Sequence, residues 1–75
     1  MAETLESLAQ LGAAVRRRRK ALGYTQEEVA EFNQVSPRFV GDLERGVAGG
    51  TFARVLDVCN SIGLDLLVQE RGEVR

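Results

Sequence analysis

The chain contains no histidine and only one cysteine, Cys59. Without histidine, the usual catalytic base for a thiol and the histidine–cysteine clusters that bind metals are both missing. A chain of 75 residues is also too short to build a sizeable pocket around two carboxylates. We therefore expect no enzyme activity, no metal and no cofactor. The single cysteine excludes an internal disulfide, and its place on an apolar helical face favours a core residue over the alternative of a reactive thiol.

Long apolar runs are also absent, because no stretch approaches the 18 residues that a membrane helix needs. The first ten residues, MAETLESLAQ, lack the basic and apolar regions of a secretory signal. Together with the lone thiol, these absences predict a cytoplasmic protein with no membrane partner. The 44% of hydrophobic residues suffices for one small domain over residues 1–75. Such a core is marginal, so we expect dimerisation to stabilise it.

An excess of positive charge is missing too, since the formal net charge of −1 at first argues against DNA binding. The distribution matters more than the sum, because residues 16–20 (RRRRK) carry five of the ten positive charges, against eleven negative charges elsewhere. The sequence thus predicts one basic pole, mostly solvated, with one or two side chains that contact phosphate. A nuclear-localisation signal is the alternative from composition alone. The low total charge predicts weak non-specific binding to DNA.

Residues 26–45, QEEVAEFNQVSPRFVGDLER, contain two short helical patterns separated by a turn. Thr25 is a typical N-cap residue, and Glu28 three positions later completes a capping box. Ser36 caps the second pattern, and Pro37 takes its first position, where a missing N–H costs nothing. This arrangement predicts a helix-turn-helix at residues 25–45, whose second helix enters a DNA groove.

The second of these helices has one apolar face, marked by Val40 and Leu43. The residues expected on the opposite face are Pro37, Arg38, Gly41, Asp42 and Arg45. Glycine in mid-helix costs roughly 1 kcal/mol relative to alanine, and it lets another molecule approach the backbone. Arg38, in the first turn, could bind guanine, and Asp42 could accept from a cytosine amino group. The alternative is that Arg38 and Asp42 only pair with each other on a solvated surface.

Several segments in order resemble the Xre/Cro/CI-like helix-turn-helix family of repressors. These are VRRRRKALGYTQ (15–26), TQEEVA (25–30), VSPRFVGDLERG (35–46) and TFARVLDVCNSIGL (51–64), which together cover about three quarters of the chain. With its short length and its tail GLDLLVQERG (63–72), the chain is most similar to the HipB-type antitoxins. The family usually has glycine where this chain has Gln34, which puts the turn geometry in question; the neighbouring Asn33 is the residue expected to absorb the strain.

The resemblance implies an all-α, lambda-repressor-like domain of four or so helices over residues 4–63. The first helix should span about residues 5–21, with a buried stripe at Leu8, Leu11, Val15 and Leu22. The last should bury Phe52, Val55, Leu56, Cys59 and Ile62 and end at Gly63. Arg19 lies beside the first stripe and needs an acidic partner. In the family this position forms a structural ion pair with the one that Glu44 occupies.

The tail alternates apolar and polar residues, which predicts a β-strand over residues 64–70. A lone strand leaves its backbone groups unpaired, and the sequence offers no second strand. We therefore expect the strand to pair with its copy across a two-fold axis. The residues expected to form this dimer contact are Leu64, Leu66, Leu67 and Val68. Residues 71–75 are expected to be frayed.

The leading hypothesis is a homodimeric, sequence-specific repressor that binds a palindromic operator in double-stranded DNA. The expected DNA-contacting residues are Gln26, Ser36, Pro37, Arg38, Phe39, Gly41, Asp42, Arg45 and Thr51. The resemblance also implies a role as antitoxin of a HipBA-type operon, which represses its own promoter and binds a HipA-type kinase toxin. The alternative is a protein-interaction module that neutralises a toxin with little or no DNA binding.

Four of these residues have roles that the sequence leaves open or assigns only broadly. Gln26 either clamps a phosphate or supports Arg38. Phe39 contacts a thymine methyl group or packs inside the protein. Arg45 is expected to contact phosphate, and Thr51 caps the last helix or reaches a phosphate. The resemblance also implies a phosphate contact for a backbone N–H near Gly46, in the loop formed by residues 46–50.

Overall fold

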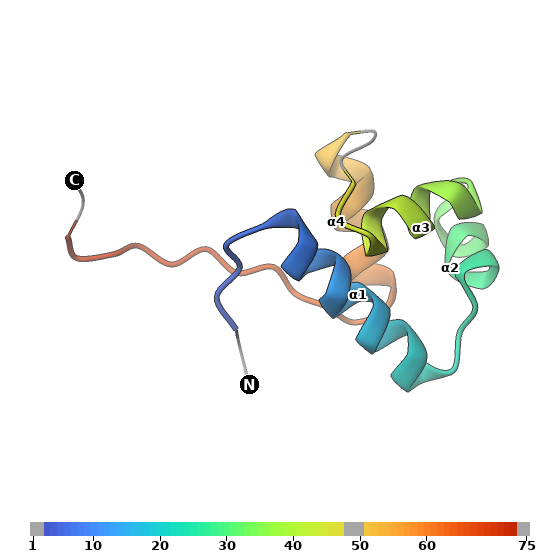
Figure 1. Cartoon of the computed structure of the whole chain (residues 1–75), viewed down its shortest axis with the longest axis horizontal. Helices are drawn as coiled ribbons and strands as arrows, with labels where there is room; N and C mark the ends of the chain where they lie inside the picture. Colours follow the sequence, from blue (N-terminus) through green and yellow to red (C-terminus); the bar gives the residue numbers. More distant parts are fainter. Residues whose placement is uncertain (1–2, 48–50, 74–75) are drawn as a thin grey trace.

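The computed structural model describes residues 3–47 and 51–73, and four α-helices occupy these residues (Figure 1). They are α1 (Leu8–Leu22), α2 (Gln26–Asn33), α3 (Pro37–Glu44) and α4 (Phe52–Ser61). The expected all-α class is confirmed. Helix α3 packs against both α1 and α2, and α4 packs against α2. Within the described residues, no helix is long and apolar enough to cross a bilayer.

Helices α2 and α3 begin at the expected N-cap residues. The Glu28 N–H donates to Thr25 Oγ1 at 3.0 Å, and the Thr25 N–H donates back to Glu28 Oε1 at 2.8 Å. At the start of α3, Ser36 Oγ accepts from the Phe39 N–H at 3.1 Å, with Pro37 in the first helical position. These short-range bonds satisfy N–H groups that would otherwise lack a partner, which is why local sequence alone locates both boundaries.

Helix α1 begins later than the expected residue 5. Ser7 is its N-cap, and its hydroxyl accepts from the Gln10 N–H at 3.2 Å while Gln10 Oε1 accepts from the Ser7 N–H at 3.1 Å. This second capping box fixes the boundary and leaves Leu5 outside the helix and exposed. At the other end, Gly23 takes a left-handed conformation (φ 80°) that ends α1.

All four helices contribute to one core. Its buried residues are Leu11, Val15, Val29, Ala30, Val40, Leu43, Val55, Val58, Cys59 and Ile62. Two predicted core residues are wrong: Leu22 is exposed because the α1 stripe ends at Arg19, and Phe52 is 64% exposed. In α4, Val58 is fully buried although it was not predicted, and the predicted Leu56 is only partly buried.

The turn between α2 and α3 requires a left-handed residue, and Gln34 takes that conformation itself (φ 56°, ψ 41°). Among the described residues it is the one non-glycine with positive φ. Asn33 does not absorb the strain, contrary to expectation, because it remains helical. Its side-chain amide instead donates to the Val29 carbonyl and to Ser61 Oγ, each at 2.9 Å, and so ties α2 to α4.

The tail leaves the helical body beside the N-terminal arm and runs away from it in an extended path (Figure 1). Residues 64–70 form no strand within the described part of this single chain, so pairing across a dimer stays a prediction. Leu64 and Leu66 pack half-buried against the core, whereas Val68 is 98% exposed. Residues 71–73 are exposed, and the remainder of the predicted frayed segment, 74–75, lies outside the described residues.

Candidate nucleic-acid interface

The exposed side of α3 carries a cluster of charged side chains. The Arg38 side chain is 89% exposed, with its Nε 3.8 Å from Asp42 Oδ2. Asp42, which is three-quarters covered, also accepts a hydrogen bond from Arg45 Nη2. The pair between Arg38 and Asp42 is thus present but long and solvated, a kind of contact that contributes at most a few tenths of a kcal/mol. It leaves the Arg38 guanidinium available to another molecule.

Gly41 lies under this cluster and is buried, which corrects the expectation that its backbone faces outward. A Cβ atom there would lie 3.3 Å from Arg45 Nη1 and 3.6 Å from Gln26 Oε1. The close approach that glycine permits is therefore made by side chains of the same molecule. The residues of the predicted reading face that remain exposed or part-exposed are Pro37, Arg38, Asp42 and Arg45.

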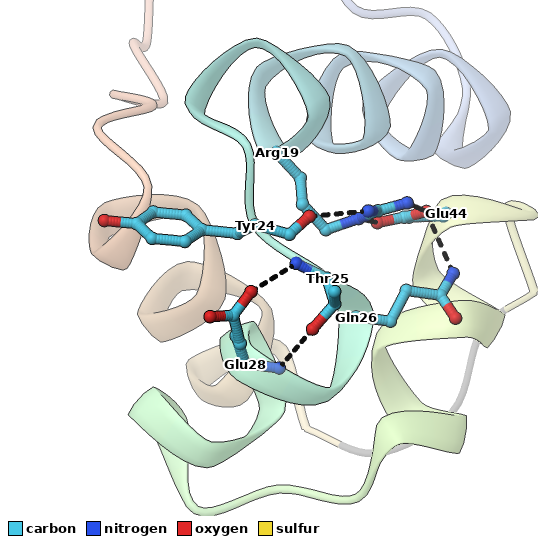
Figure 2. A network of polar contacts seen from close by, with 6 residues as sticks. All are labelled: Arg19, Tyr24, Thr25, Gln26, Glu28 and Glu44. Atoms are coloured by element: carbon cyan, nitrogen blue, oxygen red, sulfur yellow. Dashed lines mark hydrogen bonds and ion pairs between the residues drawn. The ribbon is translucent and has the colours of Figure 1, made fainter.

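A polar network fixes the C-terminal end of α3 to α1 and α2 (Figure 2). The expected ion pair of Arg19 and Glu44 is present in bidentate form, with Nε–Oε2 at 2.6 Å and Nη2–Oε1 at 3.0 Å. Arg19 Nη1 also donates to the Tyr24 carbonyl at 2.8 Å, beyond the end of α1. The Glu44 side chain is only 2% exposed, so nearly all of its hydrogen bonding is internal.

Gln26, the first residue of α2, joins the same network. Figure 2 shows its side chain directed at Glu44. Its Nε2 donates to Glu44 Oε1 at 3.1 Å, and among the described residues it makes no hydrogen bond to Arg38. One of its two proposed functions, the support of Arg38, is therefore not seen. Gln26 stays half-exposed at the junction of α2 and α3, so its remaining hydrogen-bonding groups stay near the surface.

The ionisation of this network follows from its geometry. Burial raises the pKa of Glu44, but the hydrogen bonds from Arg19 and Gln26 and the positive charges of Arg19 and Arg16 together lower it by more, so the pKa lies below the ordinary value of 4.5. The same hydrogen bond raises the pKa of Arg19, although burial acts against it. Both groups therefore stay charged at neutral pH. At Cys59, burial raises the pKa of the thiol, which is consistent with a core side chain rather than a reactive one.

The other predicted contact residues occupy mixed positions. Ser36 is exposed, but its hydroxyl already caps α3. Phe39 is partly buried and packs against the core, which favours packing over contact with a thymine methyl group. Thr51 is the N-cap of α4 by position, yet its side chain makes no capping hydrogen bond. The Gly46 N–H donates to the Leu43 carbonyl at 3.0 Å, so it is not available to a phosphate.

Two further contacts lock the core and were not predicted. Arg18 Nε donates to the Ile62 carbonyl at 2.8 Å, which satisfies a group at the C-terminal end of α4. Gly12 packs so closely against α3 that a Cβ atom would collide with the carbonyl oxygens of Leu43 and Glu44. A glycine in mid-helix is the one sequence signal that could have revealed this contact.

The fold and this exposed helix define the class of protein: a compact helix-turn-helix domain with an arginine-bearing second helix. The model of the helix-turn-helix domain family matches residues 10–72, and the chain belongs to this family of DNA-binding transcriptional regulators. It is 35% identical over 75 residues to an uncharacterised HTH-type transcriptional regulator, y4mF, of Sinorhizobium fredii, covering 100% of this chain and 99% of the relative.

Solved structures show the same fold. A chain from a HipA–HipB–O2–O3 complex superposes with a TM-score of 0.82 at 20% identity, over 92% of this chain and 97% of that one. The clp gene regulator ClgR of Corynebacterium glutamicum superposes with a TM-score of 0.72 at 33% identity, over 88% and 85%. The Xre-like, HipB-type fold expected from the sequence is thus confirmed.

Proposed function

We propose that this chain is a homodimeric repressor that recognises a palindromic operator through α3. The observation that carries this proposal is the Arg38 side chain, 89% exposed in the first turn of a helix whose inner face is fully packed. The first turn of the second helix is the part that reaches base edges in this motif. Arg38 would bind guanine O6 and N7 with two hydrogen bonds.

The polar network supports this assignment because it holds α3 rigid. Arg19, Glu44 and Gln26 join α1, the end of α3 and the start of α2 by buried or part-buried bonds. A reading helix that is already fixed loses little conformational freedom when it binds DNA, so more of the contact energy appears as affinity. Arg19 and Glu44 thus act on DNA binding through the position of α3.

Asp42 has a role within the reading face that differs from direct contact with cytosine. Its carboxylate lies between Arg38 and Arg45, and it accepts from the latter. It therefore orients Arg45, while its longer contact leaves Arg38 free to turn. On DNA, Arg38 would turn to a base while Arg45 binds a phosphate, with Asp42 remaining between them. Pro37 and Ser36 would pack beside the sugar-phosphate backbone at the start of the helix.

The extended tail supports a dimer. Its apolar residues Leu67 and Val68 are exposed, and a groove of about 500 Å³ lies between the N-terminal arm and residues 64–69. A second copy of the tail would cover these side chains and supply the missing backbone partners. Two copies of α3 would then reach half-sites about one helical turn, roughly 34 Å, apart on the DNA.

We further infer that the protein is the antitoxin of a HipBA-type operon and represses its own promoter. The near-complete overlap with a chain of the HipA–HipB–O2–O3 complex supports this idea at the level of fold. The tail sequence resembles that of the same proteins. The partner would be a HipA-type kinase toxin encoded next to this chain.

One paired experiment tests both parts. A gel shift with the DNA upstream of the gene measures operator binding, and co-purification with the product of the neighbouring gene measures partner binding. A repressor-antitoxin should shift the promoter fragment and retain the neighbour. Retention of the neighbour without a shift at low salt would favour the pure interaction module. A shift without retention would leave a repressor and reject the antitoxin role.

A further inference from the structure

The basic run of α1 separates into side chains that the protein already uses and side chains that it does not. Arg17 pairs with Glu3 at 2.7 Å, Arg18 donates to a backbone carbonyl of the α4 terminus, and Arg19 pairs with Glu44. Arg16 and Lys20 are exposed and take part in none of the hydrogen bonds or ion pairs found among residues 3–47 and 51–73. Of the five residues of the run, these two have no hydrogen-bonded or ion-paired partner among the described residues, although the nearby charge of Arg16 helps to lower the pKa of Glu44.

The position of Arg16 on α1 places it beside the reading helix. Gly12, Arg16 and Arg19 follow one another at helical spacing and share one side of α1. Gly12 lies against the carbonyls of Leu43 and Glu44, and Arg19 binds the Glu44 side chain. Arg16, between them in the sequence, therefore lies at the exposed edge where α1 meets the C-terminal end of α3. Lys20 is one helical turn further on, beyond Arg19.

Other groups at this edge that could bind a phosphate are already engaged. The N–H of Gly46 and the N–H of Val47 donate to carbonyls of α3 at 3.0 and 2.9 Å. One of the two N–H groups of the Gln26 side chain donates to Glu44, which leaves a single neutral donor there. The first turn of α2 carries Glu27 and Glu28, whose charges oppose a phosphate there. Beyond the phosphate proposed for Arg45, a second phosphate at this edge therefore requires a cation that the fold has not already paired.

We propose that Arg16, held between Gly12 and Arg19 at the junction of α1 and α3, binds a backbone phosphate of the DNA whose bases α3 reads. This inference rests on the proposed DNA-binding function and adds an anchor on a different helix. A phosphate contact carries no sequence information, so Arg16 should set the register and the affinity of the complex and leave base preference unchanged.

The test measures binding of the full chain to two probes, the fragment upstream of its gene and a duplex of unrelated sequence, across a range of salt concentrations. Arg16→Gln should weaken binding to both probes by the same factor. It should also reduce the slope of log K against log salt by about 0.9, the value for one lost phosphate contact. Arg54→Gln on α4 and Arg17→Gln on α1 remove the same charge elsewhere and should leave the slope unchanged. Arg16→Lys should restore most of it.

An unchanged slope in Arg16→Gln would overturn the assignment. A reduction of equal size in the two control variants would also overturn it, since it would indicate a general effect of charge. Loss of preference for the upstream fragment alone would instead assign Arg16 to base reading. A wild-type chain that binds neither probe at low salt would refute the proposed function itself, which separates that failure from a wrong choice of residue.

Discussion

Arg38 is the residue on which sequence preference is expected to depend. Arg38→Ala should weaken binding to the operator by about 1–3 kcal/mol and relax the preference at one base position in each half-site. Arg54→Ala, an equally charged exposed site on α4, is the matched control and should change neither. A titration by fluorescence anisotropy against single-base variants of the upstream fragment measures both effects. Equal losses for the two variants would reject Arg38 as the base-reading residue.

Glu44 should make stability depend on pH in a defined direction. Its pKa in the folded protein lies below the ordinary value of 4.5, so the folded state prefers the ionised form more strongly than the unfolded chain does. The stability from this preference is fully present above pH 4.5 and is lost as the pH falls through the lower folded value.

Urea unfolding of the wild type and of Glu44→Gln, measured from neutral to acidic pH, tests this linkage. At neutral pH the variant should be less stable by about 3 kcal/mol, because Arg19 loses a buried charged partner. Its stability should also fall less steeply below pH 4.5 than that of the wild type. Parallel pH profiles for the two proteins would contradict the assignment of this dependence to Glu44.

Whether the sequence predicts the contacts of a single residue depends on the kind of contact that the residue makes. The position of Arg19 beside an apolar stripe indicated that it needs an acidic partner, and the family resemblance identified that partner as Glu44. Gly41 was misassigned because the absence of a side chain does not say which neighbour uses the space. The hydrogen bond from Arg19 to the Tyr24 carbonyl could not be predicted, because a backbone acceptor leaves no mark in the sequence.

Among the elements, boundaries set by local bonds were predictable, and choices between adjacent faces were not. The caps at Thr25 and Ser36 depend on residues three positions away, which the sequence displays directly. In α4, Phe52 fits the apolar stripe but is exposed, whereas Val58 was not predicted and is fully buried, and only the packing of the folded helix determines this. The strand expected at residues 64–70 depends on another molecule, which the sequence of one chain does not contain.

The turn between α2 and α3 gives a prediction at the scale of the element. Gln34 takes a left-handed conformation that disfavours any residue with a Cβ atom by roughly 1–2 kcal/mol. Gln34→Gly should therefore raise the free energy of unfolding by about 1 kcal/mol, with part of the gain offset by the freer unfolded chain. Gln34→Ala keeps the strain and is the matched control. Thermal or urea unfolding measures both, and equal stabilities for the two variants would contradict the strain argument.

For the whole molecule, the net charge of −1 does not show how few cations DNA can use, because three of the five residues of the basic run are paired within the chain. Arg17, Arg18 and Arg19 hold the N-terminal arm, α4 and α3 in place. Their charges therefore stabilise contacts within the chain as well as contributing to the surface potential. Because few cations are unpaired, one domain should bind DNA weakly. Linking two domains in a dimer raises the affinity for an operator with two half-sites.

Operator binding by the whole molecule is thus expected to depend on dimer formation. A substitution at the exposed Val68 tests this expectation. Because this side chain is 98% exposed in the single chain, Val68→Asp should leave helix content and melting of the monomer unchanged. It should nevertheless place a charge in the proposed tail-to-tail contact. We expect sedimentation velocity to show a monomer, and affinity for a two-site operator to fall by about a hundredfold or more as the two half-sites lose their linkage.

Asn60→Asp is the control for Val68→Asp, since it adds the same charge at an exposed position on α4, outside the predicted dimer contact. It should remain dimeric and bind the operator as the wild type does. Affinity for a single half-site should be the same in all three proteins, because the reading helix lies far along the chain from the tail. A Val68→Asp protein that still sediments as a dimer would place the contact elsewhere on the molecule. A wild type that is monomeric yet binds both half-sites tightly would show that α3 needs no linked copy.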